Sequence, residues 1–132
     1  LNGEPLTIVG TGLQRRDFVH VKDVARAFLL MTKSDKRPTG IYNVGTGMPI
    51  SINQLADQIG GDRVYIPRRP GEPDMTRADF TRIQKLGWLP TIPFDDGVAE
   101  MLEHIEEDWG QAKVWKAEGI EKATSAWMEA LA

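Results

Sequence analysis

Two stretches of the sequence gather side chains that are suited to holding anions. In GTGLQRRDFVHV, Arg15 and Arg16 follow a glycine turn, and in PRRPGEPD, Arg68 and Arg69 precede Glu72. A guanidinium group binds phosphate through two parallel hydrogen bonds, so paired arginines favour a diphosphate. An ionised carboxylate accepts hydrogen bonds and suits the two hydroxyls of a sugar diol. If the two loops meet, they form an arginine clamp beside a carboxylate, which suits a nucleoside diphosphate; the alternative is a solvated surface.

The tetrapeptide VGTG occurs twice, at residues 9–12 and 44–47, each time after apolar residues. A strand that runs into G-x-G begins a dinucleotide-binding loop, but that fingerprint needs a third glycine three residues later, where Arg15 and Ile50 stand. It also needs an acidic residue about 20 residues on, and Asp35 is too far from the first loop. We interpret both copies as turns in which glycine supplies a positive φ, with a direct anion cradle as the alternative.

Other kinds of reactive site find little support in the sequence. There is no cysteine, and His20 and His104 are far apart, so we expect no metal site and no thiolate chemistry. No serine lies in a G-x-S-x-G elbow. The acidic pairs at 95–96 and 106–107 are sequence neighbours, which do not face each other on a helix, so we expect solvated faces.

The composition indicates a globular protein of one domain with an uneven charge. Of 132 residues, 41% are apolar and 27% charged. Residues 1–94 hold 13 Lys and Arg against 9 Asp and Glu, whereas residues 95–132 hold 3 against 10. The net charge of -3 and the lack of a basic run with aromatics exclude a nucleic-acid partner, and no apolar run reaches the roughly 18 residues of a membrane helix. The chain begins at Leu1 rather than Met, which suggests a piece of a longer chain.

The hydrophobic pattern of the first half predicts an α/β fold. Strands are predicted at residues 6–9, 16–21 and 41–45. A helix is predicted at residues 22–33, with one face formed by Val24, Ala27, Phe28 and Met31. The strand, helix and strand over residues 16–45 predict a βαβ unit with parallel strands.

The second half alternates short elements with loops. Ser51 and Gln54 have the spacing of a capping box, so a helix should begin there and end at Gly60 and Gly61. A short strand at 63–67, a loop at 68–79, a helix from Asp79 to about Leu86 and an extended segment at 88–93 follow. Two acidic-tail helices are predicted from their apolar stripes. The stripes are Val98, Met101, Leu102, Ile105 and Trp109, and Ile120, Ala123, Trp127 and Leu131. Trp109, Trp115 and Trp127 are interpreted as core or interface anchors rather than a ligand stack.

Four motifs together resemble a known family, the extended short-chain dehydrogenases that act on nucleotide-diphosphate sugars. The motifs are GTGLQRRDFVHVKDVARAF, IYNVGTGMPISINQLA, PRRPGEPDMTRAD and LGWLPTIPFDDGV, in the family order. The family includes UDP-galactose 4-epimerases, dTDP-glucose dehydratases and UDP-glucuronate decarboxylases. The motifs are specific to the superfamily but separate its members poorly.

The resemblance implies roles for particular residues. Arg16 and Arg69 would contact the substrate diphosphate, and Glu72, one methylene longer than the family's aspartate, would lie by the ribose. Gln14 would lie near the substrate, and the strand from Thr7 to Val9 beside the base. Residues 41–45 resemble the last strand of the dinucleotide-binding sheet. The resemblance thus implies a Rossmann-type sheet edge plus the small C-terminal substrate-binding region.

The family's cofactor loop and its Tyr-x-x-x-Lys pair are missing from this sequence, because Thr46 follows Tyr42 and Arg69 follows Tyr65 at that spacing. The resemblance therefore implies that residues 1–109 are the substrate-binding part of a longer cytoplasmic NAD-dependent enzyme, with NAD bound by the missing N-terminal part. Residues 110–132 would be a helical tail. A UDP-sugar is the expected partner, a 4-epimerase the expected activity, and a homo-oligomer the expected state. The alternative from another class is a stand-alone sugar-nucleotide or protein binding module without catalysis.

Overall fold

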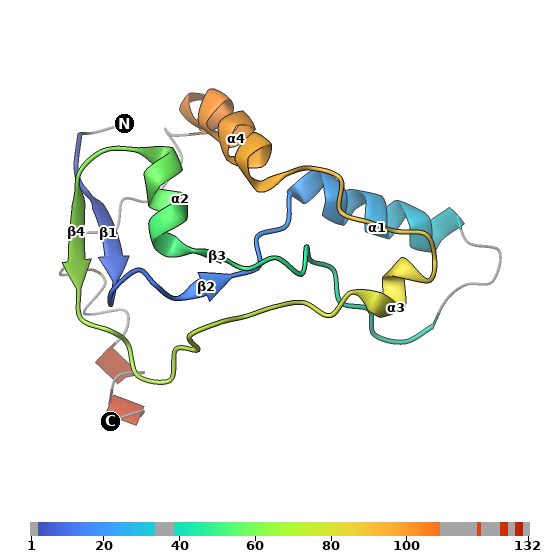
Figure 1. Cartoon of the computed structure of the whole chain (residues 1–132), viewed down its shortest axis with the longest axis horizontal. Coiled ribbons are helices and arrows are strands. Elements are labelled where there is room, and N and C mark those ends of the chain that lie inside the picture. The colour runs from blue at the N-terminus through green and yellow to red at the C-terminus, as the bar shows by residue number, and fades with distance from the viewer. Residues whose placement is uncertain (1–2, 34–38, 109–118, 120–124, 127–128, 131–132) are drawn as a thin grey trace.

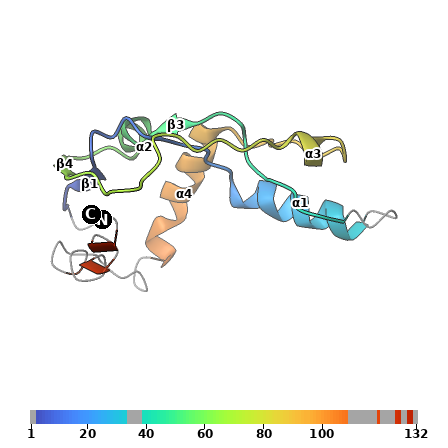
Figure 2. The same cartoon turned by 90° about the horizontal axis from the view of Figure 1, so that it is seen from below.

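The computed structural model describes residues 3–33, 39–108, 119, 125–126 and 129–130. Its elements, in chain order, are β1 (Leu6–Val9), β2 (Arg15–Arg16), α1 (Val21–Lys33), β3 (Ile50–Ser51), α2 (Ile52–Ile59), β4 (Arg63–Ile66), α3 (Thr81–Gln84) and α4 (Phe94–Asp108). The molecule is elongated, with β1, β4 and α2 at one end and α1 and α3 at the other (Figure 1). Turned by 90°, it shows α1 and α4 on the same side of the long connecting loops (Figure 2).

Two small sheets organise the chain. β1 and β4 pair in parallel, with Leu6 opposite Arg63 and Val9 opposite Ile66. β2 and β3 pair antiparallel in the middle of the molecule, and an isolated bridge joins Arg15 to Met75. Parallel strands need a long crossover, and here it runs through α1 and α2. The predicted α/β class with parallel strands is confirmed.

The predicted βαβ unit over residues 16–45 is wrong in detail. Of residues 16–21, only Arg16 is in a strand, and residues 41–45 lie outside any strand. A strand exists only where a neighbouring strand completes its hydrogen bonds, and the described residues offer none beside these segments. The parallel pair is formed instead by the strands predicted at 6–9 and 63–67.

The helix predicted from the capping-box spacing at Ser51 and Gln54 is present as α2. Ser51 accepts a hydrogen bond from the Gln54 backbone N–H, and the Gln54 side chain accepts from the Ser51 N–H, so the predicted capping box is confirmed. Gly60 ends the helix with a φ of 78°, a left-handed value that favours glycine. Ala56 is the fully buried residue of this helix, while Ile59 is 40% exposed.

The main core lies at the α1 end, around the indole ring of Trp88. Trp88 packs on Ala27 and Ile83, and a second group closes over them, made up of Leu30, Met31, Tyr42, Val44 and Phe80. The Phe80 and Trp88 rings meet edge to face at 6.0 Å between centroids. Phe28, predicted on the same apolar face of the helix as Ala27, is 70% exposed.

Asp23 is fully buried beside this core, where it joins α1 to residues 88–92. Its carboxylate accepts hydrogen bonds from the Thr91 N–H at 2.9 Å, the Thr91 hydroxyl at 2.8 Å and the Ile92 N–H at 3.1 Å. The Arg26 guanidinium pairs with it, and the indole N–H of Trp88 donates to its backbone carbonyl at 3.0 Å. Burial raises the pKa of Asp23, but the hydrogen bonds from Thr91 and Ile92 and the charge of Arg26 outweigh it, so the pKa lies below its usual value.

The apolar stripe of α4 lies over α2. Val98, Met101, Leu102 and Ile105 line a groove of about 750 Å³ together with Leu55 and Ile59. Met101 is 65% exposed, so the groove is open on one side. Trp109, Trp115 and the second predicted stripe, Ile120, Ala123, Trp127 and Leu131, lie outside the described residues.

The depressed pKa of Asp23 predicts a loss of stability in acid. The folded-state pKa lies below the ordinary 3.8, so the unfolded chain takes up the proton first as the pH falls. The contribution is therefore complete above about pH 5 and is lost as the pH falls through 3.8 toward the folded pKa. Asp23→Asn should lower the free energy of unfolding at pH 7 by about 2–4 kcal/mol, measured by urea denaturation. It should also flatten the pH dependence between about pH 5 and pH 3.

The matched control is Asp57→Asn, because the Asp57 side chain is 64% exposed in its ion pair with Arg63. It should cost less than about 1 kcal/mol. An unchanged acid slope in Asp23→Asn would contradict the assignment.

Candidate functional site: a pocket between the first glycine turn and the arginine loop

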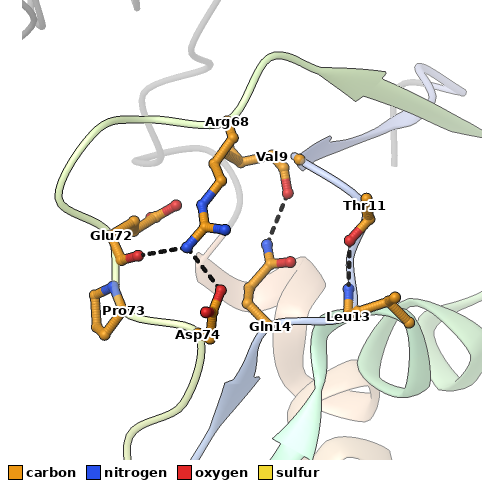
Figure 3. A pocket seen from close by; sticks show the side chains of 9 residues that line it. Val9, Thr11, Leu13, Gln14, Arg68, Glu72, Pro73 and Asp74 are labelled. Carbon is orange, nitrogen blue, oxygen red and sulfur yellow. Dashed lines mark hydrogen bonds and ion pairs between the residues drawn. The ribbon is translucent and has the colours of Figure 1, made fainter. Parts of the chain in front are cut away.

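A pocket of about 330 Å³ opens where β1 and β4 end (Figure 3). It is lined by Val9, Gly10, Thr11, Leu13, Gln14, Arg68, Glu72, Pro73 and Asp74. The lining comes from two short segments, residues 9–14 at the end of β1 and residues 68–74 after β4. Because β1 and β4 are parallel neighbours, both segments leave the same edge of the sheet. The volume falls within the range of about 300–1,000 Å³ that is usual for small-molecule sites.

The first wall is the GTG turn that follows β1. Gly10 and Gly12 have φ values of 65° and 71°, so the prediction of a glycine turn is confirmed for this copy. The Gln14 side chain donates to the Val9 carbonyl at 2.7 Å and braces the turn. On the outer side, the Asn53 N–H donates to the Gly12 carbonyl at 2.9 Å, and its side chain donates to the Thr11 carbonyl at 3.0 Å. A Cβ on Gly12 would lie 2.0 Å from Asn53 Oδ1, so α2 packs directly on the turn.

The second wall belongs to the loop after β4, residues 68–79, which we call the arginine loop. Arg68 extends across the pocket opposite Gln14 and toward Asp74 (Figure 3). Its guanidinium donates to the Glu72 carbonyl at 2.9 Å and to the Asp74 carboxylate at 2.6 Å. The Arg68 and Asp74 side chains are 59% and 83% exposed, so this pair stabilises the loop only weakly.

The two predicted anion-binding stretches meet along the backbone of Arg15. Its N–H donates to the Asp74 carbonyl at 2.8 Å, and its carbonyl accepts from the Thr76 N–H at 3.1 Å. The Arg16 guanidinium donates to the Pro73 carbonyl at 3.0 Å. The residues joined by that last bond are 57 apart in the chain.

Of the six predicted site residues, three line the pocket and three do not. Val9, Gln14 and Glu72 line the pocket. Arg16 is not part of the lining, but it donates a hydrogen bond to the carbonyl of the lining residue Pro73. Arg69 and Thr7 are outside the lining; Arg69 is half-buried and Thr7 is exposed on β1. Arg68, the neighbour of Arg69, lines the pocket instead.

The second GTG turn, at residues 45–47, binds the carboxylate of Asp17, an anionic group of the chain itself. The Asp17 carboxylate accepts from the Thr46 N–H at 2.8 Å, the Thr46 hydroxyl at 2.6 Å and the Gly47 N–H at 2.8 Å. The Ala78 N–H adds a fourth bond at 2.9 Å. Burial raises the pKa of Asp17, but these hydrogen bonds outweigh it and lower the pKa below its usual value. Gly47 has a φ of 70°, so the turn prediction is confirmed here too.

Sequence reasoning missed Asp17 because it placed the residue in a strand. Its partners are 29, 30 and 61 residues away, beyond the reach of any local pattern. The available signal was chemical: the N–H groups of a glycine turn need acceptors, and a carboxylate is a strong one.

Within the described residues, both glycine turns are engaged by other parts of the chain. The N–H groups of Thr46 and Gly47 are already bonded to Asp17, and α2 packs on the first turn at Gly12. Among the same residues, no cluster of three or more His, Asp or Glu is arranged to hold a metal ion.

Comparison with known proteins identifies relatives of this chain. Residues 1–45 match the model of the NAD dependent epimerase/dehydratase family. The chain is 32% identical over 129 residues to the human dTDP-D-glucose 4,6-dehydratase, covering 88% of this chain and 35% of that protein. The crystal structure of the Thermotoga maritima UDP-glucose 4-epimerase with UDP-glucose superposes with a TM-score of 0.73 at 31% identity, over 81% of this chain and 36% of that one.

A further structural neighbour is the Bacillus cereus UDP-glucuronic acid 4-epimerase, which was solved with UDP-glucuronic acid and NAD. It has a TM-score of 0.74 at 27% identity, over 80% of this chain and 36% of that one. Fold and sequence together define a Rossmann-type α/β protein related to sugar-nucleotide enzymes. The chain belongs to the NAD-dependent epimerase/dehydratase family and spans about a third of the length of the relatives that it matches.

The packing of α2 on the first glycine turn can be tested with two alanine substitutions. Gly12→Ala and Gly61→Ala both place an L side chain at positive φ, 71° and 85°, but a Cβ on Gly61 meets nothing within 4 Å. Gly61→Ala should therefore show only the backbone strain of about 1–2 kcal/mol. Gly12→Ala should add about 1–3 kcal/mol of overpacking against Asn53. Urea denaturation of both variants gives the difference, and equal losses would mean that Asn53 does not close on Gly12.

Proposed function

We propose that this chain is the C-terminal, substrate-binding part of an NAD-dependent sugar-nucleotide epimerase or dehydratase, with a UDP-sugar as ligand and 4-epimerisation as the reaction. The observation that carries the proposal is the meeting of the two anion-binding stretches. The backbone bonds of Arg15 to Asp74 and Thr76 bring residues 14–16 beside residues 68–74, and a pocket opens between them. Two solved neighbours hold UDP-glucose and UDP-glucuronic acid.

We assign each part of the ligand to one of the residues that the family resemblance implies. We assign the base to the neighbourhood of Thr7 and Val9, the ribose hydroxyls to the carboxylate of Glu72, and a nearby polar contact to Gln14. The diphosphate falls to Arg16 and Arg69. The guanidinium of Arg68 binds Asp74 and the Glu72 carbonyl, and that of Arg16 binds the Arg15 and Pro73 carbonyls. The choice of Arg16 and Arg69 over Arg68 therefore follows the family motif.

The remaining functions are assigned to chain outside these 132 residues. The 132-residue sequence holds neither the family's cofactor loop nor its Tyr-x-x-x-Lys pair. NAD and the proton-transfer groups would therefore come from an N-terminal part, with residues 1–109 serving the substrate and residues 110–132 forming a tail. We place the enzyme in the cytoplasm as a homo-oligomer. Within the described residues, no helix has the length and apolar character needed to cross a bilayer.

A second candidate is a binding module that recognises a sugar nucleotide without chemistry. The described pocket favours it as much as the enzyme, because the pocket accounts for binding alone. A cofactor loop and a Tyr-x-x-x-Lys pair in the gene upstream of Leu1 would decide for the enzyme.

The division of labour predicts that the purified 132-residue chain does not turn over any sugar nucleotide. The expected result is no conversion of UDP-glucose to UDP-galactose, with or without added NAD, in a coupled assay. The physical reason is that the family's catalytic Tyr-x-x-x-Lys pair and its NAD-binding loop are both absent from this sequence. Turnover by the purified chain would overturn the proposal and require an acid–base pair within these residues.

The assignment of the diphosphate predicts which arginines matter. Arg16→Ala and Arg69→Ala should each weaken UDP binding by about thirtyfold or more, because truncating one partner of a desolvated charge pair costs about 2–5 kcal/mol. Arg69→Lys should also weaken binding, since it keeps the charge but loses the fork. Glu72→Ala should weaken UDP more than inorganic pyrophosphate, because pyrophosphate has no ribose.

The controls are variants of the neighbouring residues Arg15 and Arg68. The UDP affinity of every variant is measured by calorimetric titration of UDP into the full-length natural chain. Arg15→Ala and Arg68→Ala should leave the UDP affinity nearly unchanged. If these two prove the sensitive pair, Arg68 in the pocket holds the phosphate and the assignment to Arg69 is wrong. An equal response from all four would reduce the site to a diffuse basic patch.

A further inference from the structure

We propose that Asp17 is the positioning residue of this pocket: its carboxylate fixes the arginine loop against residues 14–16 and thereby sets the spacing of the two walls. The inference rests on the proposed function for the identity of the ligand. It gives a role in binding to a residue that does not line the pocket.

The two oxygens of Asp17 divide their partners between two other segments. Oδ1 accepts from the N–H and the hydroxyl of Thr46. Oδ2 accepts from the N–H of Gly47 and from the N–H of Ala78, at 2.8 and 2.9 Å. One oxygen therefore joins the second glycine turn to the end of the arginine loop. A side-chain amide cannot replace this arrangement, because one of its two positions would be an NH₂ group facing N–H donors.

Both segments held by Asp17 lead directly to the pocket. The stretch that contains Ala78 begins at Asp74, whose carbonyl accepts from the Arg15 N–H, and Asp74 lines the pocket. The turn at Gly47 runs into β3, which pairs with β2 so that Ile50 lies opposite Arg16. Residues 15–17 are thus bonded on one side to β3 and on the other to the arginine loop. Releasing Asp17 frees the far end of that loop.

The contact between Asp17 and Ala78 also depends on the absence of a side chain at Gly45. A Cβ on Gly45 would lie 2.4 Å from the Ala78 Cβ and 3.0 Å from Asp17 Oδ2. Real Cβ atoms do not approach this closely, so only glycine lets Ala78 and Asp17 meet here. Gly45→Ala should push Ala78 away from the carboxylate without changing any charge.

Asp23 offers a matched control elsewhere in the fold. It too is a carboxylate with a lowered pKa that accepts several hydrogen bonds, and its loss should destabilise the chain. Its partners lie at residues 26, 91 and 92, and none of them lines the pocket. Comparing variants of the two aspartates therefore distinguishes a general loss of stability from a change in the spacing of the pocket walls.

The test is calorimetric titration of UDP into the full-length natural chain and into Asp17→Asn, Gly45→Ala and Asp23→Asn, at a temperature where each variant is folded. Asp17→Asn and Gly45→Ala should weaken UDP by about tenfold to a hundredfold, as expected when binding groups are displaced by about 1 Å. Asp23→Asn should be less stable yet bind UDP with the affinity of the parent chain. Hydrogen exchange of the Gly47 and Ala78 amides should accelerate in Asp17→Asn and not in Asp23→Asn.

Three results would overturn the inference. The first is a Kd for UDP that is unchanged in Asp17→Asn, and the second is an equal loss of affinity in Asp17→Asn and Asp23→Asn; both leave the proposed function standing. The third is a parent chain that does not bind UDP, which removes the proposed function as well. If Asp17→Asn does not fold, Gly45→Ala decides, and an unchanged UDP affinity in that variant counts against the inference.

Discussion

The carboxylate of Asp17 accepts hydrogen bonds from the turn at residues 46–47 and from Ala78, and the middle of the molecule is arranged around it. The sheet of β2 and β3 is too small to define the spacing of the loops beside it, since each strand has two residues. A charged acceptor surrounded by N–H donors gives shorter and stronger hydrogen bonds than neutral pairs do. Asp23 does the same at the other end of the molecule, where it ties α1 to residues 91–92. In a larger sheet, backbone hydrogen bonds between strands would fix the positions of such segments. Here the carboxylates of Asp17 and Asp23 fix the positions of the loops.

The features that the sequence predicts correctly are those whose causes lie within a few residues. Ser51 and Gln54 are three positions apart and form the capping box of α2, and Gly60 ends that helix at positive φ. The strands at 6–9 and 63–66 follow from their composition. Their pairing does not, because it joins residues more than fifty positions apart. The sequence instead favoured a parallel pair formed by residues 16–21 and 41–45, most of which lie outside any strand. Those two segments have strand-like composition but no neighbour within the described residues to complete a ladder.

In the candidate site, too, the sequence predicts the local features but not those that depend on long-range contacts. The residue types of the two arginine stretches indicate an anion, and the structure brings the stretches together through Arg15, Asp74 and Thr76. Which arginine enters the pocket was beyond sequence reasoning, because Arg68 and Arg69 are adjacent and point in directions that the loop backbone decides. The two VGTG copies are alike in sequence and differ in use. The first packs against Asn53 and walls the pocket, whereas the second holds Asp17.

The parallel pairing of β1 with β4 has a consequence for the order in which the protein assembles. The two walls of the pocket are separated by 57 residues along the chain at the bond between Arg16 and Pro73. Contacts between such distant residues form late, because the entropy of closing the intervening loop is lost before they compensate for it. A ligand that touches both walls binds only the assembled state and so stabilises it by mass action. Any ligand that contacts both walls would then hold together two segments that are far apart in the chain, and its concentration would help set how much of the protein is folded.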